Sequence, residues 1–185
     1  MTDSPLARVR LLALDVDGVL TDGAVTLTDD GRETKTFHVH DGLGIVVAAL
    51  VGLRTVWVTG RTSPVVERRA RELGVSDLRQ GVRDKAMCLT EIAAALCVPL
   101  ASVAYMGDDW NDLPALGVAG VRLAPANAAP EVLAVADYIS PRPGGQGAVR
   151  DALRAILSAR GEWDAAQTLY LASLRSHIGT TGSGQ

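Results

Sequence analysis

Short apolar runs alternate with helix-patterned segments along most of the 185-residue chain, and this rhythm constrains the fold more than any other feature. Strands are expected near residues 9–16, 54–59, 76–80, 103–107, 118–122 and 137–139. Helices are expected near residues 41–52, 63–73, 84–97, 128–135 and 147–160. The alternation predicts an α/β fold with a doubly wound parallel sheet, whose ligands bind at the carboxyl ends of the strands.

One segment interrupts this rhythm directly after the first strand. Residues 24–27 and 34–38 are rich in β-forming side chains and flank Asp29-Asp30-Gly31, a turn sequence, so a β-hairpin is expected there. The sequence has no internal repeat and no sign of a second domain. Residues 1–160 are therefore expected to form one domain, followed by a partly disordered tail over residues 161–185 that ends in Gly-Thr-Thr-Gly-Ser-Gly-Gln.

Charge and hydropathy exclude two classes of partner. The net charge is -3 and no basic run is interleaved with aromatic residues, so no nucleic-acid partner is expected. The longest apolar run, Ile45 to Leu53, is far shorter than the roughly 20 residues that a membrane span needs. Residues 1–10 carry no apolar core of a secretory signal. A cytoplasmic protein without a membrane partner is therefore expected.

Neither the two cysteines nor His38 and His40 are expected to form a metal site. Cys88 and Cys97 are nine positions apart on a predicted helix, about 180° around its axis, which excludes a shared metal or disulfide. Both are expected to be small core residues. His38 and His40 are expected to alternate on a strand, one on each face, with no third ligand in sight.

Two carboxylates follow the first predicted strand. Asp15 and Asp17 come directly after the apolar run 9–14 and stand two positions apart, so their side chains share one face of an extended chain. Alone, the pair could merely cap a turn. Paired anions at a strand end also suit a divalent cation and a phosphoryl group.

Three further polar segments fall at the ends of strands or the start of a helix. Thr59-Gly60-Arg61 and the run 107–112 each follow a strand, and Lys85 opens a helix. Taken alone, Thr59-Gly60-Arg61 is most simply a strand-to-helix turn, and Lys85 is most simply a solvated lysine. The run 107–112 is a stronger signal, because its carboxylates repel one another when buried unless a cation pairs them. The chain has only two lysines, Lys35 and Lys85, among eighteen basic residues, so Lys85 favours a site that needs a compact ammonium.

Together with the aspartate pair, these segments resemble the four motifs of the haloacid dehalogenase superfamily phosphatases, over residues 9 to about 158. The resemblance implies that Asp15 is the nucleophile, forming an aspartyl-phosphate, and that Asp17 is the general acid and base. It implies a Mg²⁺ ion held by Asp15, the backbone carbonyl of Asp17, and Asp108.

The resemblance extends to the remaining polar residues of these motifs. Thr59 would bind phosphoryl oxygens, and Lys85 would neutralise the charge of the transferring group. Asp109 and Asp112 would orient the site.

The spacing of the motifs leaves no room for a cap domain, because 44 residues separate Asp15 from Thr59 and 26 separate Thr59 from Lys85. The chain therefore resembles the capless group that includes 3-deoxy-D-manno-octulosonate 8-phosphate phosphatase, with further matches over residues 37–45 and 144–150. This group implies a homotetramer in which the hairpin, residues 24–37, covers a neighbour's site. The substrate-binding set that it implies comprises Asp17, His38, Val39, His40, Asp41, Gly42, Thr59, Gly60, Arg61, Arg69 and Lys85.

Several alternatives remain open at this point. Val46, His40 and Leu43 depart from the octulosonate pattern, so the substrate is a keto-sugar-acid phosphate of that kind, a nine-carbon analogue or another small phosphorylated metabolite. Arg69 lies on a helix where Glu67–Arg71 and Arg68–Glu72 form i,i+4 pairs, as on a solvated charged face. A phosphotransferase or mutase with the same nucleophile, a signalling receiver domain and an inactive regulatory homologue are the rival functions. The order of the motifs disfavours the receiver domain.

Overall fold

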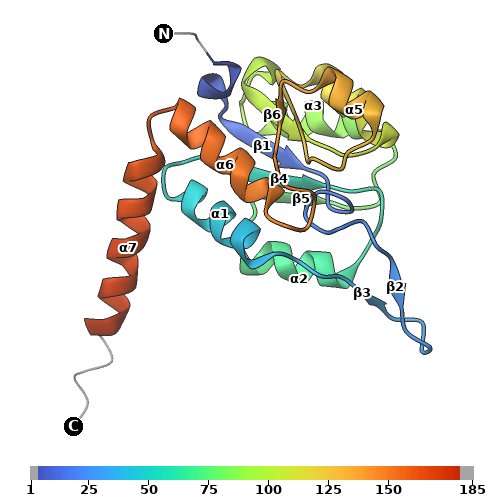
Figure 1. The fold of residues 1–185 in the computed structure, drawn as a ribbon, viewed down its shortest axis with the longest axis horizontal. Coiled ribbons are helices and arrows are strands. Elements are labelled where there is room, and N and C mark those ends of the chain that lie inside the picture. Colours follow the sequence, from blue (N-terminus) through green and yellow to red (C-terminus); the bar gives the residue numbers. More distant parts are fainter. Residues whose placement is uncertain (1–3, 180–185) are drawn as a thin grey trace.

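The structure is a computed structural model that describes residues 4–179, with side chains described through residue 175. Six parallel strands form its central sheet, in the order β5-β4-β1-β6-β7-β8 (Figure 1). The strands are β1 Leu11–Leu14, β4 Arg54–Val58, β5 Asp77–Arg79, β6 Val103–Met106, β7 Val121–Ala124 and β8 Tyr138–Ile139. The prediction of a doubly wound parallel sheet is confirmed.

Helices cover both faces of this sheet. The helices are α1 Val39–Ala49, α2 Pro64–Glu72, α3 Lys85–Ala95, α4 Leu113–Val118, α5 Pro130–Val135, α6 Ala148–Ala159 and α7 Trp163–Gly179, with short 3-10 turns η1 Pro5–Arg8, η2 Leu100–Ser102 and η3 Trp110–Asp112. Leu12 and Leu14 of β1 pack in the core beneath α1, α2 and α6, whereas Leu11 and Ala13 pack in the core beneath α3, α4 and α5. This alternation is why β1 is apolar at every position.

The strand register brings the predicted motifs to one edge. Leu14, the last residue of β1, pairs with Trp57 on one side and Met106 on the other. The chain therefore leaves β1, β4 and β6 at nearly the same level, and their following loops meet at the carboxyl edge of the sheet. The order of the strands reverses at β1, and this is where open α/β sheets bind ligands.

The hairpin predicted after the first strand is present, with shorter strands than expected. It consists of β2 Thr26–Leu27 and β3 Glu33–Thr34, paired antiparallel, and Gly31 takes a left-handed conformation in its turn. The hairpin stands away from the body of the molecule (Figure 1). No cap domain is evident in the part of the chain that the structure describes.

Two local predictions differ from the structure. His38 and His40 do not alternate on a strand: His38 is the N-cap of α1 and His40 lies in its first turn, with ring centroids 4.9 Å apart. A tertiary contact stabilises this turn, because the Asp41 carboxylate accepts a hydrogen bond of 2.7 Å from the Arg150 amide at the start of α6. Cys88 is buried as expected, but Cys97 lies beyond α3 and is exposed.

The boundary of one strand also moved. The strand expected at 118–122 is β7, which begins at Val121, because the preceding residues form α4. The 3-10 turn η3 lies within the run 107–112 and α4 directly follows it, and neither was in the predicted element order.

Helix α7 occupies most of the segment that was expected to be a tail. It runs along one side of the molecule beside α6 and α1 (Figure 1). The side chain of Ala166 is buried, and the guanidinium groups of Arg150 and Arg154 lie 5.2 and 5.6 Å from the ring centroid of Trp163. The glycine-rich end predicted to be disordered lies outside the described residues after Gly179. Within the described range, no helix combines the length and apolar character needed to cross a membrane.

Candidate active site

A polar cleft of about 240 Å³ lies at the carboxyl edge of the sheet, where the loops after β1, β4 and β6 meet. Its lining residues are Asp15, Asp17, Gly23, Thr59, Gly60, Arg61, Asp108, Asp109 and Asn111. Three of the four predicted motifs therefore line one cleft, and the fourth, Lys85, lies directly beneath it.

The floor of the cleft is an inner cluster, consisting of Asp15, Lys85, Tyr105, Asp108 and Asp112. The Lys85 side chain is 2% exposed, and its Nζ lies 3.0 Å from Asp15 Oδ1 and 2.7 Å from Asp112 Oδ1. The Tyr105 hydroxyl also donates to Asp112 Oδ1, at 2.7 Å. Asp112 Oδ2 accepts a hydrogen bond from the Asp108 amide, at 2.9 Å. Asp112 thus connects β6, α3 and the loop of Asp108.

The inner cluster carries more negative than positive charge. Burial and the neighbouring Asp112 raise the pKa of Asp15 to about 7. Burial, Asp112 and Asp15 raise the pKa of Asp108 to about 7 as well. Burial alone would lower the pKa of Lys85, but the carboxylates of Asp15 and Asp112 outweigh it and raise that pKa. Three carboxylates with one ammonium are therefore short of positive charge.

A divalent cation fits this deficit. Asp15, Asp108 and Asp112 each offer a ligand atom, and these atoms lie within 4.8 Å of one another. Carboxylate oxygens are the side-chain ligands that Mg²⁺ prefers. Because Asp112 is already bonded to Lys85, Tyr105 and the Asp108 amide, Asp15 and Asp108 are the better candidates for direct ligands.

An outer cluster, consisting of Asp17, Glu33, Lys35 and Arg61, forms one wall of the cleft. Lys35 Nζ forms an ion pair with Asp17 Oδ1 and lies 3.5 Å from Glu33 Oε1. Arg61 Nη2 pairs with the same Glu33 oxygen at 2.5 Å, and its Nε lies 3.8 Å from Asp17 Oδ2. The hairpin of this chain therefore contacts the second aspartate of the pair.

Thr59 and Gly60 form the wall that follows β4. Thr59 is 2% exposed, and its Oγ1 accepts a hydrogen bond of 3.3 Å from the Arg61 amide. The Thr59 backbone is fixed on both sides, since its amide donates to Arg79 and its carbonyl accepts from Val82. This rigid turn places a hydroxyl group in the cleft beside Asp15 and Asp17.

Glycines hold the aspartate-bearing loop in place. Gly18 has a φ of +96°, and a Cβ there would lie 2.0 Å from Asp108 Oδ2. On the other side, a Cβ at Gly144 would lie 1.7 Å from the Gly18 carbonyl oxygen, and the Gly145 amide donates to Val19 at 3.0 Å. The loop is thus clamped between Asp108 and the segment 144–145, which explains the match seen in the sequence there.

Part of the predicted substrate-binding set does not line this cleft. His38, Val39, His40, Asp41, Gly42 and Arg69 lie apart from it within one chain. Arg69 pairs with Glu72 at 3.3 Å and lines a surface hollow beside Phe37. His40 lines another hollow, with Arg142 and Arg150, and Asp41 bonds the Arg150 amide. The expected i,i+4 pairs of α2 are present, at 3.2 Å for Arg68–Glu72 and 2.8 Å for Arg71–Glu67.

The sequence analysis missed four residues of the site. Tyr105 lies in β6, Asn111 lies in the run 107–112, and Glu33 and Lys35 come from the hairpin. Two of them had a signal, since Asn111 lies in a predicted motif and Lys35 is one of the two lysines in the chain. Trp110 is 65% exposed and adjoins the cleft residues Asp109 and Asn111 in the chain.

Comparison with known proteins agrees with this geometry. The family described as haloacid dehalogenase-like hydrolase matches residues 76–153. The 3-deoxy-D-manno-octulosonate 8-phosphate phosphatase KdsC of Escherichia coli (strain K12) is 39% identical over 159 residues, which cover 86% of this chain and 85% of the relative.

Solved structures show the same similarity over most of the fold. The 3-deoxy-D-manno-octulosonate 8-phosphate phosphatase of Moraxella catarrhalis, solved with magnesium ion, phosphate ion and KDO, has a TM-score of 0.87 at 39% identity, covering 91% of this chain and 97% of that one. A probable YrbI family phosphatase of Pseudomonas syringae pv. phaseolica 1448a has a TM-score of 0.88 at 42% identity, covering 91% and 96%.

Proposed function

Since the chain belongs to the family of 3-deoxy-D-manno-octulosonate 8-phosphate phosphatases, within the haloacid dehalogenase-like hydrolases, it is a phosphatase, and we propose that it hydrolyses 3-deoxy-D-manno-octulosonate 8-phosphate through an aspartyl-phosphate. The observation that carries the chemistry is the buried Lys85 between Asp15 and Asp112, beneath a cleft that Thr59 also lines. It combines a nucleophile and a fixed positive charge in one place.

In the first half of the reaction, an Asp15 carboxylate oxygen attacks phosphorus and the bond from phosphorus to the sugar oxygen breaks. Asp17 gives its proton to the departing oxygen, so that oxygen leaves as a neutral hydroxyl group of the sugar acid. Lys85 and the Thr59 hydroxyl offset the charge on the phosphoryl oxygens. Lys85 is already bonded to Asp15 in the resting protein, so little reorganisation is needed.

In the second half, Asp17 removes a proton from water, and the resulting hydroxide attacks the phosphorus of the aspartyl-phosphate. The bond between phosphorus and Asp15 breaks, which releases phosphate and restores the free carboxylate. A residue that can activate water favours hydrolysis over transfer to a second acceptor. This is the argument against the phosphotransferase or mutase alternative.

Asp15, the Asp17 carbonyl and Asp108 would hold Mg²⁺ at this site. The acidic cluster and the magnesium ion in the Moraxella catarrhalis structure support this assignment. When bound, Mg²⁺ supplies charge compensation and orientation of the phosphoryl group.

Part of the surface expected to bind the sugar acid does not line the cleft of a single chain. The segment 38–42 and Arg69 lie outside the cleft, and the hairpin carries exposed apolar residues, Val25 at 51% and Leu27 at 65%. A homotetramer in which residues 24–37 cover a neighbour's site would supply the missing surface. The catalytic domain would be residues 1–160, and the expected location is the cytoplasm.

Assembly is tested by dilution. Specific activity should fall as the protein dissociates, because the neighbour's hairpin no longer excludes water from the cleft. Activity that stays constant across the dissociation range, followed in parallel by light scattering or sedimentation, would contradict the tetramer.

The substrate is tested by release of phosphate in the presence of Mg²⁺. The panel comprises 3-deoxy-D-manno-octulosonate 8-phosphate, a nine-carbon keto-sugar-acid phosphate, and simple sugar phosphates as controls. The octulosonate ester should have the highest kcat/KM. The nine-carbon ester is the main competitor, because Val46, His40 and Leu43 depart from the octulosonate pattern. A higher kcat/KM for that ester would reassign the substrate. No turnover of any ester would revive the inactive regulatory homologue.

A further inference from the structure

We propose that Lys35 is a positioning residue for the proton-transfer step, acting from the hairpin through its ion pair with Asp17. The inference rests on the proposed function, because it takes Asp17 as the general acid and base. It goes beyond that function by giving the hairpin of the same chain a direct part in the chemistry.

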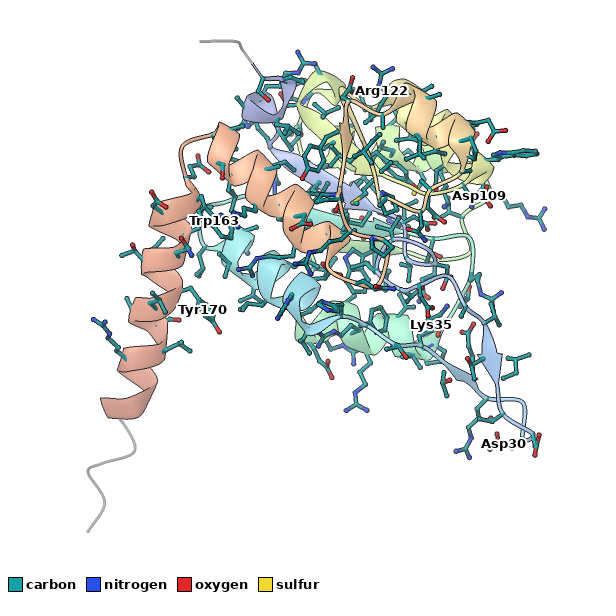
Figure 2. All side chains as sticks on the ribbon, in the orientation of Figure 1. Asp30, Lys35, Asp109, Arg122, Trp163 and Tyr170 are labelled. Carbon is teal, nitrogen blue, oxygen red and sulfur yellow. The ribbon has the colours of Figure 1, made fainter. Side chains whose placement is uncertain are left out.

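The first argument is burial. The Lys35 side chain is only 1% exposed, although it directly follows a two-residue strand of a hairpin that otherwise faces solvent. Figure 2 places Asp30 at the hairpin tip and Lys35 at its base, where the chain returns to the body. A buried ammonium is costly unless carboxylates surround it. Here the carboxylates are Asp17 and, at 3.5 Å, Glu33.

The second argument is the distribution of the two lysines. The chain has eighteen lysines and arginines, and all of them except Lys35 and Lys85 are arginine. Both lysines are almost fully buried, with side chains 1% and 2% exposed, and each contacts one carboxylate of the aspartate pair. Lys85 holds Asp15, and Lys35 holds Asp17. An ammonium is a compact point charge with three donors, and it occupies less space beside a carboxylate than a planar guanidinium.

The third argument is the state of the Asp17 oxygens. Oδ1 is engaged by Lys35, whereas Oδ2 is buried and has no hydrogen-bond partner among the described residues. Arg61 Nε lies 3.8 Å from Oδ2, too far for a hydrogen bond. The ion pair therefore fixes Asp17 by Oδ1 and leaves Oδ2 free to carry the proton that passes to the leaving group.

Lys35 is not placed to bind substrate itself. It does not line the cleft, and its side chain is closed to solvent. Without it, the Asp17 carboxylate would be free to rotate toward Arg61, which would engage the oxygen needed for proton transfer. The loss should therefore depend on how much the leaving group needs an acid.

The test compares two leaving groups in the variant Lys35→Met, which keeps the length of the side chain and removes the ammonium. For an alkyl sugar-acid phosphate, kcat should fall by about 100-fold, a typical contribution of a positioned acid, with KM changed less than about threefold. For p-nitrophenyl phosphate, whose phenolate leaves with little acid help, the rate of the first phenolate release, before Asp17 acts as a base, should fall by less than about fivefold. Equal losses on both substrates, or a change in KM alone, would overturn the proposal.

Two variants serve as controls. Arg71→Met removes a cation on α2 that pairs with Glu67 and is 75% exposed, and it should leave both rates unchanged. Lys35→Gln keeps a donor and a similar shape, so it provides the same comparison of leaving groups should the methionine variant fold poorly. In an Asp17→Asn background, Lys35→Met should have no further effect, because Lys35 acts through Asp17.

A structural measurement separates this inference from the proposed function. If the wild-type enzyme hydrolyses no phosphomonoester, the proposed function fails. The crystal structure of Lys35→Met then decides the positioning role by itself. A displaced Asp17 carboxylate supports it, and a carboxylate in the wild-type position refutes it.

Discussion

The inner cluster forms the floor of the cleft and the outer cluster forms one of its walls, and the two are built from different kinds of structure. Every inner side chain comes from the end of a central strand or from a helix packed on the sheet, and Asp112 is fully buried. The outer cluster depends on Glu33 and Lys35, which a hairpin with two-residue strands brings to Asp17. The covalent chemistry is thus assigned to the rigid core, and the proton transfer to a segment anchored mainly at its base.

The most damaging change to the inner cluster is Asp15→Asn. Removing the nucleophile should lower kcat by at least about 10⁴-fold, because no other oxygen takes its place in line with the leaving group. The measurement is phosphate release, with the melting temperature from circular dichroism to show that the fold is kept. Asp22→Asn is the matched control, since its exposed carboxylate bonds only the Ala24 amide within the described structure. Retained turnover in Asp15→Asn would remove Asp15 from the mechanism.

Asp112→Asn should break the inner cluster through stability. Asp112 Oδ2 accepts a hydrogen bond from the backbone amide of Asp108, and Oδ1 accepts hydrogen bonds from Lys85 and Tyr105. The NH₂ group of an asparagine would face one of these donors. The free energy of unfolding should fall by about 3 kcal/mol, as for breaking a buried ion pair. Urea denaturation measures it. Asp109→Asn, a change of the same size at an exposed helix cap, should cost less than about 0.5 kcal/mol. Equal stability of the two variants would contradict the difference in rigidity.

The pH dependence of magnesium binding sharpens the contrast further. Burial and Asp112 raise the pKa of Asp15 and Asp108 to about 7 in the metal-free protein, so protons compete with the cation. The apparent Kd for Mg²⁺ should weaken by about 10- to 100-fold between about pH 8 and about pH 6. Isothermal titration calorimetry in two buffers measures both the Kd and the protons released. A Kd independent of pH would contradict the competition between protons and Mg²⁺ for these carboxylates.

The same shifts set the sign of the stability change. Because both folded-state values lie above the ordinary value of 3.8, their contribution to stability is present below that value and is lost as the pH rises through about 7. In EDTA, the melting temperature of the protein should therefore fall from about pH 5 to about pH 8, as these two groups lose their protons. Added Mg²⁺ should raise the melting temperature most near about pH 8.

The smallest effect is expected for Glu33→Gln in the outer cluster. Arg61 is 48% exposed, so losing its pair with Glu33 should change the free energy of unfolding by less than about 1 kcal/mol. Lys35 keeps Asp17 as a partner, and kcat should change by less than about threefold. A loss as large as that of Lys35→Met would show that the whole outer cluster, and not the single ion pair, orients Asp17.

The residues that sequence reasoning found are those whose position follows from the backbone. Asp15, Thr59 and Asp108 stand directly after strands, and a parallel sheet brings such positions together whatever the side chains nearby. The hairpin was also predictable, because Gly31 and its neighbours encode a turn in the local sequence.

The features that local sequence patterns do not predict depend on contacts between distant parts of the chain. His38 and His40 alternate with valine as in a strand, yet a bond from Asp41 to the Arg150 amide accompanies a helix start there. Lys35 reaches Asp17 across a separation of 18 residues, which no local pattern shows. The scarcity of lysine points equally to Lys35 and Lys85, but only Lys85 stands at a predicted motif.

The glycines at 144 and 145 have a consequence for the order in which the enzyme becomes competent during synthesis. All the motif residues have been made once the ribosome has passed Asp112, but the backbone of the nucleophile loop lacks the neighbour that confines it until Gly144 and Gly145 emerge. A nascent or truncated chain that ends between these points holds a full set of reactive groups in an unfinished arrangement. Maturation of the active centre is thereby tied to completion of the last third of the polypeptide.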